Sequence, residues 1–305
     1  MHRHLLSLVL HVISVALGVS LLSFVFMHLS GDPVMLMLPP EATSQQIDDF
    51  RERMGFNDPI PLQYLRFLSG AVKGDFGTSL RHQQPAMSIV LERLPATIEL
   101  AVTGMGLALL VAVPFGILSA IRRGSFLDYA VMSGSLLGLS MPNFWVGIVG
   151  ILIFAVKFRL LPTAGRGTWA QLVLPSLALG SYLMALIARL TRSGMLEVIN
   201  QDYIRTARAK GVAERLIILR HALMNALIPL VTVVGLQMGE LLGGTVVIET
   251  VFAWPGVGRL ILQAVFQRDY PLVQAAVFIL AMIFVGTNLL VDAAYRYLDP
   301  RIRHA

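Results

Sequence analysis

Residues 202–229 read Asp-Tyr-Ile-Arg-Thr-Ala-Arg-Ala-Lys-Gly, then Val-Ala-Glu-Arg-Leu-Ile-Ile-Leu-Arg, then His-Ala-Leu-Met-Asn-Ala-Leu-Ile-Pro. This stretch is basic, contains several small residues, and lies between two strongly apolar segments. A simple pore needs no such connection between its membrane segments, whereas a membrane protein that works with a soluble partner does. The stretch therefore indicates a membrane protein that carries a docking loop.

The composition also indicates a membrane protein. Of the 305 residues, 56% are hydrophobic and only 14% are charged, and the mean hydropathy is +0.72, which is too apolar for a soluble protein of this length. The formal net charge of +6 does not indicate nucleic-acid binding, because the Lys and Arg residues lie beside apolar segments and not in a separate basic domain. The absence of cysteine excludes disulfides and cysteine metal sites.

The fold class predicted from the apolar segments is an all-α integral membrane protein with six transmembrane helices. A helix needs about 20 apolar residues to cross a bilayer. The segments that meet this requirement are 5–27, 96–121, 129–156, 173–190, 222–247 and 272–295. The first is too long for the apolar part of a secretory signal and is followed by no small-x-small cleavage site, so we interpret it as a retained anchor.

Basic residues set the predicted orientation. Lys and Arg gather near the N-terminus, in the connection after residue 121, in the 191–221 loop and near the C-terminus, which are alternate connections. Cytoplasmic connections retain Lys and Arg, so both termini and the 191–221 loop are predicted to be cytoplasmic. The localisation expected for such a multi-pass protein is the bacterial inner membrane.

The long segment 29–95 is predicted to be a folded insertion on the outer face, within a single permease-like domain that spans residues 1–305. Thr43-Ser-Gln-Gln46 resembles a capping box at the start of a helix that Gly55 ends. A second helix is predicted from about Pro61 to Gly70, and the glycines of 74–77 predict a turn.

Motifs for chemistry are absent from the sequence. The dipeptide Gly-Lys occurs nowhere, so the chain has no Walker A phosphate loop and is not itself an ATPase. Neither H-E-x-x-H nor G-x-S-x-G occurs. We therefore predict no catalytic residues, no metal site and no enzymatic activity.

Polar residues inside the predicted spans are candidates for a translocation path, because an ionisable group in hydrocarbon should face a cavity or a partner. Glu240 lies near the middle of the fifth span with Gln237 on the same helical face, and Asn288 and Asp292 form a similar pair in the sixth. These groups could instead only hold neighbouring helices together. Gly235, Gly239 and Gly243 form a small-residue stripe that predicts helix packing, either within the chain or against another subunit.

The basic loop has two possible partners on physical grounds. Its arginines alone would explain binding to anionic membrane lipid. Ala207, Ala209 and Gly211 favour a protein partner, because small residues beside a glycine that can take positive φ allow another surface to come close to the backbone.

The same residues resemble the cytoplasmic loop of permeases of ATP-binding-cassette (ABC) importers of the dipeptide, oligopeptide and nickel class, in particular the first of the two permease types. The resemblance covers nearly the whole chain. Its motifs are Asp202–Gly211, His221–Pro229, Gly31-Asp-Pro33, Gly74-Asp-Phe-Gly-Thr-Ser79, Arg93-Leu-Pro-Ala-Thr97, Ser140-Met-Pro-Asn-Phe-Trp145, Glu249–Gly258, Arg268-Asp-Tyr-Pro271 and Asp299–Arg303. Arg205-Thr206-Ala207 replaces the Glu-Ala-Ala of the general importer consensus, which is usual in the peptide class.

The resemblance implies the six-helix fold of type I importer permeases and an ATP-driven transport function. The partners that it implies are a second homologous permease, two ATPases that bind ATP and Mg, and an outer solute-binding protein. It assigns ATPase coupling to Tyr203, Arg205, Thr206, Ala207, Arg208, Ala209, Lys210 and Gly211. The cargo stays open among dipeptides, oligopeptides, glutathione, nickel chelates, opines, some sugars and other solutes. The alternative function is a secondary transporter or channel that uses Glu240 and Asp292.

Overall fold

The computed structural model describes residues 2–29, 34, 38, 42–53 and 55–298. Their secondary structure is helical apart from an isolated antiparallel bridge between Thr78 and Pro85. The chain divides into two compact units, of which unit 1 contains residues 1–97 and 255–286 and unit 2 contains residues 98–254 and 287–305. The motifs at 31–33 and 299–303 lie outside the described residues.

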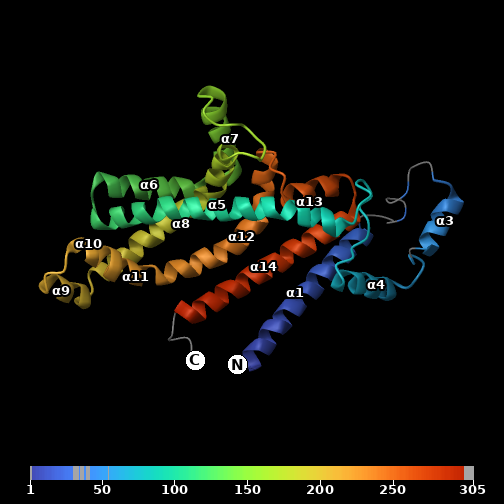
Figure 1. The fold of residues 1–305 in the computed structure, drawn as a ribbon, viewed down its shortest axis with the longest axis horizontal. Helices are drawn as coiled ribbons and strands as arrows, with labels where there is room; N and C mark the ends of the chain where they lie inside the picture. Colours follow the sequence, from blue (N-terminus) through green and yellow to red (C-terminus); the bar gives the residue numbers. More distant parts are fainter. Residues whose placement is uncertain (1, 30–33, 35–37, 39–41, 54, 299–305) are drawn as a thin grey trace. The chain divides into compact units, whose positions relative to one another are not determined.

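Unit 1 contains α1 (His2–Leu29), α3 (Ser44–Arg53), α4 (Ile60–Val72), α13 (Val257–Phe266) and the first parts of α5 (Ala86–Ile121) and α14 (Tyr270–Leu298) (Figure 1). Its apolar core is formed by α5, α13, α14 and the segment that follows α4. Phe76, Val90, Leu260 and Leu272 are buried in this core. The sequence analysis did not predict α13, because its ten residues are too few to cross a bilayer.

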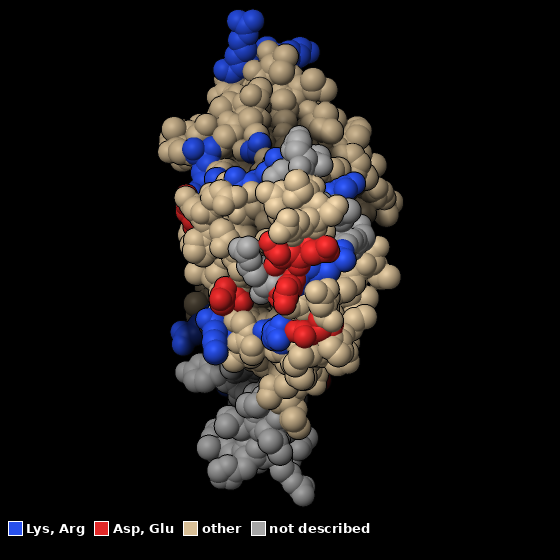
Figure 2. Space-filling model, turned by 90° about the vertical axis from the view of Figure 1, so that its right-hand side faces the viewer, with Lys and Arg blue, Asp and Glu red and all other residues tan. Residues whose placement is uncertain are grey.

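Local signals in the predicted insertion are confirmed in the structure. The Thr43 backbone N–H donates to Gln46 Oε1 at 2.9 Å and the Gln46 N–H donates to Thr43 Oγ1 at 3.4 Å, which is the predicted capping box. Gly55 has φ +70°, the left-handed conformation in which glycine is favoured. Asp48, Asp49 and Glu52 of α3 are exposed. Figure 2 shows acidic and basic side chains mixed on the face that it presents. The position of the insertion outside the membrane stays a prediction.

Unit 2 contains the remainder of α5 and the end of α14, together with the helical elements between residues 126 and 251. These are α6 (Phe126–Ser140), α7 (Asn143–Gly150), the π-helical η1 (Ile151–Lys157), α8 (Trp169–Ile199), α9 (Asp202–Ala209), α10 (Glu214–Leu216), the π-helical η2 (Ile217–Ala222), α11 (Leu223–Ala226) and α12 (Ile228–Val251). α8 is the centre of this unit, because α6, α7, α11 and α12 all contact it.

Glycines bring α8 close to its neighbours. A Cβ at Gly180 would lie 2.6 Å from the carbonyl oxygen of Gly104 on α5. A Cβ at Gly116 would lie 2.7 Å from the carbonyl oxygen of Ala188, and one at Gly138 on α6 would lie 2.9 Å from Ala185 Cβ. Backbone contact of this kind is how membrane helices gain packing energy in the absence of a hydrophobic driving force.

Among the described residues, four helices are long and apolar enough to cross a membrane, and two bent helix pairs raise the number to six if each pair is one span. The predicted third span, 129–156, is not one straight helix, because α6 and the α7–η1 helix meet at 107°. Met141 is extended at the break, with φ −91° and ψ 130°, because the ring of Pro142 disfavours the helical conformation of the residue before it. The predicted fifth span bends by 55° between Glu214–Ala226 and Pro229–Leu241.

Two helices extend beyond their predicted apolar segments. α5 has 36 residues, which corresponds to about 54 Å and exceeds the hydrocarbon thickness of about 30 Å. Its first turns, 86–95, had been included in the predicted insertion. α8 continues to Ile199, so residues 191–199 of the predicted 191–221 loop are helical. Helix formation does not stop where the membrane does, so hydropathy alone cannot locate these ends.

Candidate docking helix and polar cavity

One face of α9 is fixed to unit 2. Ile204 is fully buried and Ala207 is half-buried in an apolar cluster. Ile117 of α5, Met195 of α8 and Ile217 of η2 belong to the same cluster. Because the cluster takes side chains from several helices, a displacement of α9 must disturb the packing of α5 and α8.

The end of α9 forms a Schellman motif. The Val212 N–H donates to the Ala207 carbonyl at 3.2 Å and the Gly211 N–H donates to the Arg208 carbonyl at 2.9 Å. Gly211 has φ +76°, and a Cβ there would have nothing within 4 Å. The sequence predicts a short helix ended by a glycine that can take positive φ, and the left-handed backbone at Gly211 confirms this. The close approach of a partner to this glycine stays a prediction.

Tyr203 joins the two halves of the 202–229 stretch. Its hydroxyl accepts a hydrogen bond from Asn225 Nδ2 at 3.1 Å and donates to the carbonyl oxygen of His221 at 3.4 Å. Asn225 Nδ2 also donates to the His221 carbonyl at 2.8 Å. These contacts attach the start of α9 to η2 and α11, so Tyr203 positions α9.

Arg208 forms a two-pronged ion pair within the chain. Its Nη2 and Nε lie 2.7 and 3.1 Å from the two carboxylate oxygens of Glu214. The hydrogen bond from Arg208 lowers the pKa of the Glu214 carboxyl below its ordinary value. The pair therefore stabilises the folded segment at neutral pH and loses this contribution as the pH falls through the folded pKa. Both side chains are about half exposed, so the contribution is small. The resemblance assigns Arg208 to ATPase coupling, and within this chain its guanidinium is paired with Glu214.

The outward face of α9 and its end is polar and contains a small residue. Arg205, Thr206, Ala209 and Lys210 are exposed. Within the described residues, Arg205 has one acidic neighbour, Asp202, whose Oδ1 lies 3.8 Å from Arg205 Nη1. Both side chains are almost fully exposed, so this ion pair is weak. Arg205 and Lys210 are therefore the outward charges, and Ala209 is the exposed small residue of the helix.

Gln237 and Glu240 line one cavity, as the shared helical face predicts. Glu240 is exposed in this chain, and the cavity has a volume of about 110 Å³. Asn143 and Tyr182 line it too, and the sequence analysis did not identify them as path residues. The position of Asn143, directly after the proline that breaks the third span, was the available signal, since broken membrane helices line cavities. The sequence could not reveal Tyr182, because its position depends on how α8 packs.

The other candidate residues of the spans have different surroundings. Asn288 is half-buried on α14 and does not line this cavity, and the side chain of Asp292 lies outside the described residues. Along the glycine stripe, a Cβ at Gly235 would lie 2.3 Å from Val291 Cγ1, so this glycine allows α12 to pack against α14 within the chain. Gly239 is buried, whereas Gly243 is exposed and has nothing within 4 Å of a Cβ.

Several of the sequence motifs meet in unit 1. Ser79 Oγ donates to Asp269 Oδ2 at 2.5 Å, which joins the 74–79 motif to the 268–271 motif. The Val257 N–H donates to Thr97 Oγ1 at 2.8 Å, which joins the 93–97 motif to the start of α13. The first amides of a helix have no partner within it, so Thr97 satisfies an amide of α13, and Asp269 accepts from the Leu272 N–H at 3.4 Å at the start of α14.

These features define a class of protein. An all-helical membrane protein with broken spans, a polar cavity beside one break and a basic helix fixed to the bundle is a transport permease. The chain belongs to the family of binding-protein-dependent transport system inner membrane components, whose description matches residues 112–304. The N-terminal component of the same kind of transport system matches residues 1–101.

Curated relatives cover almost the whole chain. The dipeptide transport system permease protein DppB of Alkalihalophilus pseudofirmus is 43% identical, over 96% of this chain and 96% of its own length. The oligopeptide transport system permease protein AppB of Bacillus subtilis is 42% identical, over 96% of each chain. The glutathione transport system permease protein GsiC of Escherichia coli K12 is 42% identical, over 94% of each chain.

Solved structures of the MetNI methionine ABC transporter in inward-facing conformations share the fold. One crystal form matches with a TM-score of 0.58 and 20% identity, over 70% of this chain and 97% of that chain. A second form matches with a TM-score of 0.59 and 19% identity over the same shares. At this level of identity the likeness concerns the fold alone. The resemblance noted in the sequence is thus confirmed, and the chain is a non-catalytic permease subunit of an ABC importer.

Proposed function

We propose that the chain carries peptides or peptide-like solutes, such as dipeptides, oligopeptides or glutathione, across the membrane, and that α9 is the helix on which a partner ATPase docks. The observation that carries the proposal is the construction of α9. Ile204 and Tyr203 fix one side of it to the bundle, while Arg205, Ala209 and Lys210 are exposed. A helix held in this way can transmit force and still offer a surface to a partner.

The family is binding-protein-dependent, which implies ATPase and solute-binding protein partners. A second permease subunit beside this chain is part of our proposal. ATP and Mg are held by the ATPases, and this chain contributes no residue to their chemistry. Closure of the ATPases on ATP would displace α9, and the packing of Ile204 against Ile117 and Met195 would carry that displacement into α5 and α8.

Peptide cargo is supported by the names of three relatives and by the cavity on α12. The relatives are named for the transport of dipeptides, oligopeptides and glutathione, and these three kinds of cargo have amide and carboxylate groups in common. Asn143, Tyr182 and Gln237 supply neutral hydrogen-bonding groups to the cavity, and Glu240 supplies a carboxylate. Such groups can bind amides and an amino terminus without selecting one side chain. No specific observation favours the secondary transporter or channel as an alternative.

The docking proposal predicts a loss of uptake when Ala209 is replaced by glutamate. Ala209 is exposed, so the change leaves the apolar cluster intact, but it adds bulk and a negative charge at the proposed contact, between the outward charges of Arg205 and Lys210. We expect uptake and ATPase copurification to fall at least about tenfold at unchanged permease abundance, since misplaced charge at an interface costs several kcal/mol. Ala207→Asp is a less specific test, because Ala207 packs against the cluster.

The matched control is Ala164→Glu, the same substitution at an exposed alanine in the connection between η1 and α8, which is predicted to lie on the opposite side of the membrane. It should leave both uptake and ATPase copurification unchanged. Wild-type uptake and normal ATPase binding in Ala209→Glu would remove α9 from the docking surface.

Orientation is tested by labelling single cysteines, because the natural chain has none. Ser44 and Ser193 are both exposed and are predicted to lie on opposite sides of the membrane. Ser44→Cys should react with an impermeant maleimide in intact cells, and Ser193→Cys should react only after permeabilisation. Labelling of both from outside would contradict the predicted orientation of the docking helix.

A further inference from the structure

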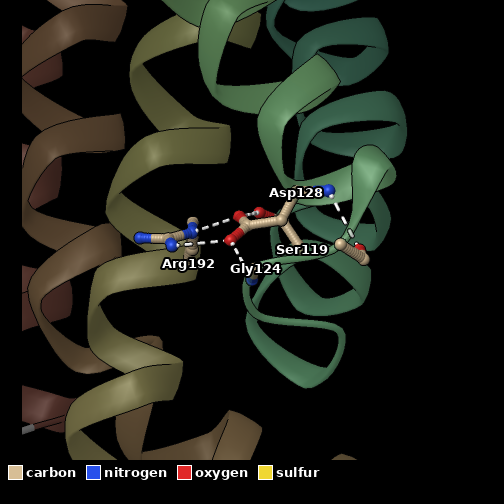
Figure 3. Close-up of polar contacts among 5 residues, drawn as sticks. Ser119, Gly124, Asp128 and Arg192 are labelled. Atoms are coloured by element: carbon tan, nitrogen blue, oxygen red, sulfur yellow. Dashed lines mark hydrogen bonds and ion pairs between the residues drawn. The ribbon is translucent and has the colours of Figure 1, made fainter.

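A bidentate ion pair connects α6 to α8. Arg192 Nε lies 2.6 Å from Asp128 Oδ1, and Arg192 Nη2 lies 2.9 Å from Asp128 Oδ2 (Figure 3). The Asp128 side chain is only 5% exposed and the Arg192 side chain 21%. The planar guanidinium and the carboxylate thus meet in the geometry that fixes both the distance and the angle between two helices.

The Asp128 carboxylate also binds the end of α5 and the turn that follows it. Ser119 Oγ donates to Asp128 Oδ1 at 2.5 Å, and the Gly124 N–H donates to Asp128 Oδ2 at 2.9 Å. Gly124 has φ +75°, so the turn requires a residue that tolerates the left-handed conformation. One carboxylate therefore joins three helices, namely α5 through Ser119, α6 through its own backbone and α8 through Arg192.

The ion pair lies next to the root of the docking helix. Arg192 is less than one turn of α8 from Met195, which belongs to the apolar cluster with Ile117 and Ile204. α8 ends at Ile199, and α9 begins at Asp202. A force on α9 thus enters α8 directly through the chain and through the cluster. The apolar contacts link α9 with α5 and α8, while Asp128 brings α6 into the same assembly.

We infer that Asp128 and Arg192 are positioning residues for transport, which fix α6 and the α5–α6 turn to α8 so that displacement of α9 moves the three helices as one body. This inference rests on the proposed docking role of α9. It assigns the pair to the transmission of force and not to contact with cargo or ATPase. α6 leads through the Pro142 break to α7, whose first residue Asn143 lines the polar cavity, so the pair connects the docking helix with the cavity.

Stability alone is a poor reason for this pair. Two charges removed from water lose solvation that their mutual attraction barely recovers, and apolar residues of similar size often serve as well or better. Apolar residues cannot supply the two directed hydrogen bonds by which Arg192 on α8 holds the carboxylate of Asp128 on α6. The two roles therefore separate experimentally, because a neutral pair that keeps an acceptor for the Gly124 N–H holds the turn but removes the fork between α6 and α8.

The test compares transport per ATP hydrolysed in the reconstituted complex of this permease, the second permease, the ATPases and the binding protein. The probe is a labelled dipeptide or glutathione, whichever the wild-type complex takes up. In the double variant Asp128→Asn with Arg192→Met, the amide oxygen still provides an acceptor beside Ser119 and the Gly124 N–H, whereas the fork to α8 is lost. We expect normal abundance and normal ATPase copurification, with uptake per ATP lowered about tenfold, the size of a typical coupling between two sites. Arg192→Lys, which keeps the charge but not the fork, should give an intermediate ratio.

Arg189→Met is the matched control, because Arg189 is an exposed arginine about one turn earlier on α8. It should leave the ratio unchanged. An unchanged ratio in the double variant overturns the inference, and so does failure of the double variant to accumulate, since the pair would then be needed for folding. A wild-type chain that carries no ATPase would instead refute the docking proposal, so the two failures are distinguishable.

Discussion

Replacement of Gly180 by leucine is expected to abolish accumulation of the folded permease. A Cβ at this position would lie 2.6 Å from the Gly104 carbonyl oxygen and 3.4 Å from the Gly104 carbonyl carbon, and the remaining atoms of leucine have to fit in the same place. The group that would have to move is backbone of α5, which cannot change rotamer. Overpacking usually costs about 1–3 kcal/mol, and a clash with helix backbone belongs at or above the upper end of that range.

The measurement is the amount of monodisperse protein recovered in detergent, together with its thermal midpoint. Gly106→Leu is the control, because Gly106 is two residues from Gly104 on the same helix but is exposed and has nothing within 4 Å of a Cβ. It should accumulate normally. Equal recovery of the two variants would show that α5 and α8 do not meet at Gly104 and Gly180.

Removal of the Asp269 carboxylate has the second large effect. Asp269 is fully buried and accepts hydrogen bonds from Ser79 Oγ at 2.5 Å, from the Arg81 N–H at 3.4 Å and from the Leu272 N–H at 3.4 Å. Asp269→Ala leaves these donors without their acceptor and removes the cap of α14. A buried group left without its partner costs about 1–3 kcal/mol, and a lost cap about 1 kcal/mol, so we expect destabilisation by about 3 kcal/mol.

Asp75→Ala serves as the comparison, since Asp75 is exposed and its side chain accepts a single hydrogen bond, from the Gly77 N–H at 2.9 Å, within the part of the chain that the structure describes. Its cost should be below about 1 kcal/mol. Limited proteolysis of the region around residues 74–86 reports the loss. If the carboxylate acts through Ser79, then Ser79→Ala should be destabilising in the wild type and nearly neutral in Asp269→Ala, because the two side chains share one interaction.

Hydropathy predicts an apolar segment at 129–156, and the structure shows that this segment is two helices that meet at Met141 and Pro142. The apolar segment 129–156 satisfies the length of a span, yet proline restricts the residue before it and bends the path by 107°. The sequence contained the signal for this break, but not its angle. The angle depends on what α6 and α7 pack against, and both contact α8.

Four of the residues in the family motifs have a structural role only as two hydrogen-bonded pairs. Ser79 and Asp269 are 190 residues apart, and Thr97 and Val257 are 160 apart, so neither pair follows from local spacing. The sequence identified the members of each pair as features of a family. The fold assigned them a physical task, which is to satisfy the ends of α13 and α14.

The sequence by itself determined the membrane class, the apolar segments, the capping box at Thr43 and the glycine that ends the helix at 211, because each follows from composition or from interactions within a few residues. Only the tertiary structure decided that Arg208 pairs with Glu214, and that Arg192 meets Asp128 64 residues away. The physical reason is the same throughout. Local propensity and hydropathy act along the chain, whereas the partner of a buried charge or a close-packed glycine is chosen by helices that meet only after folding.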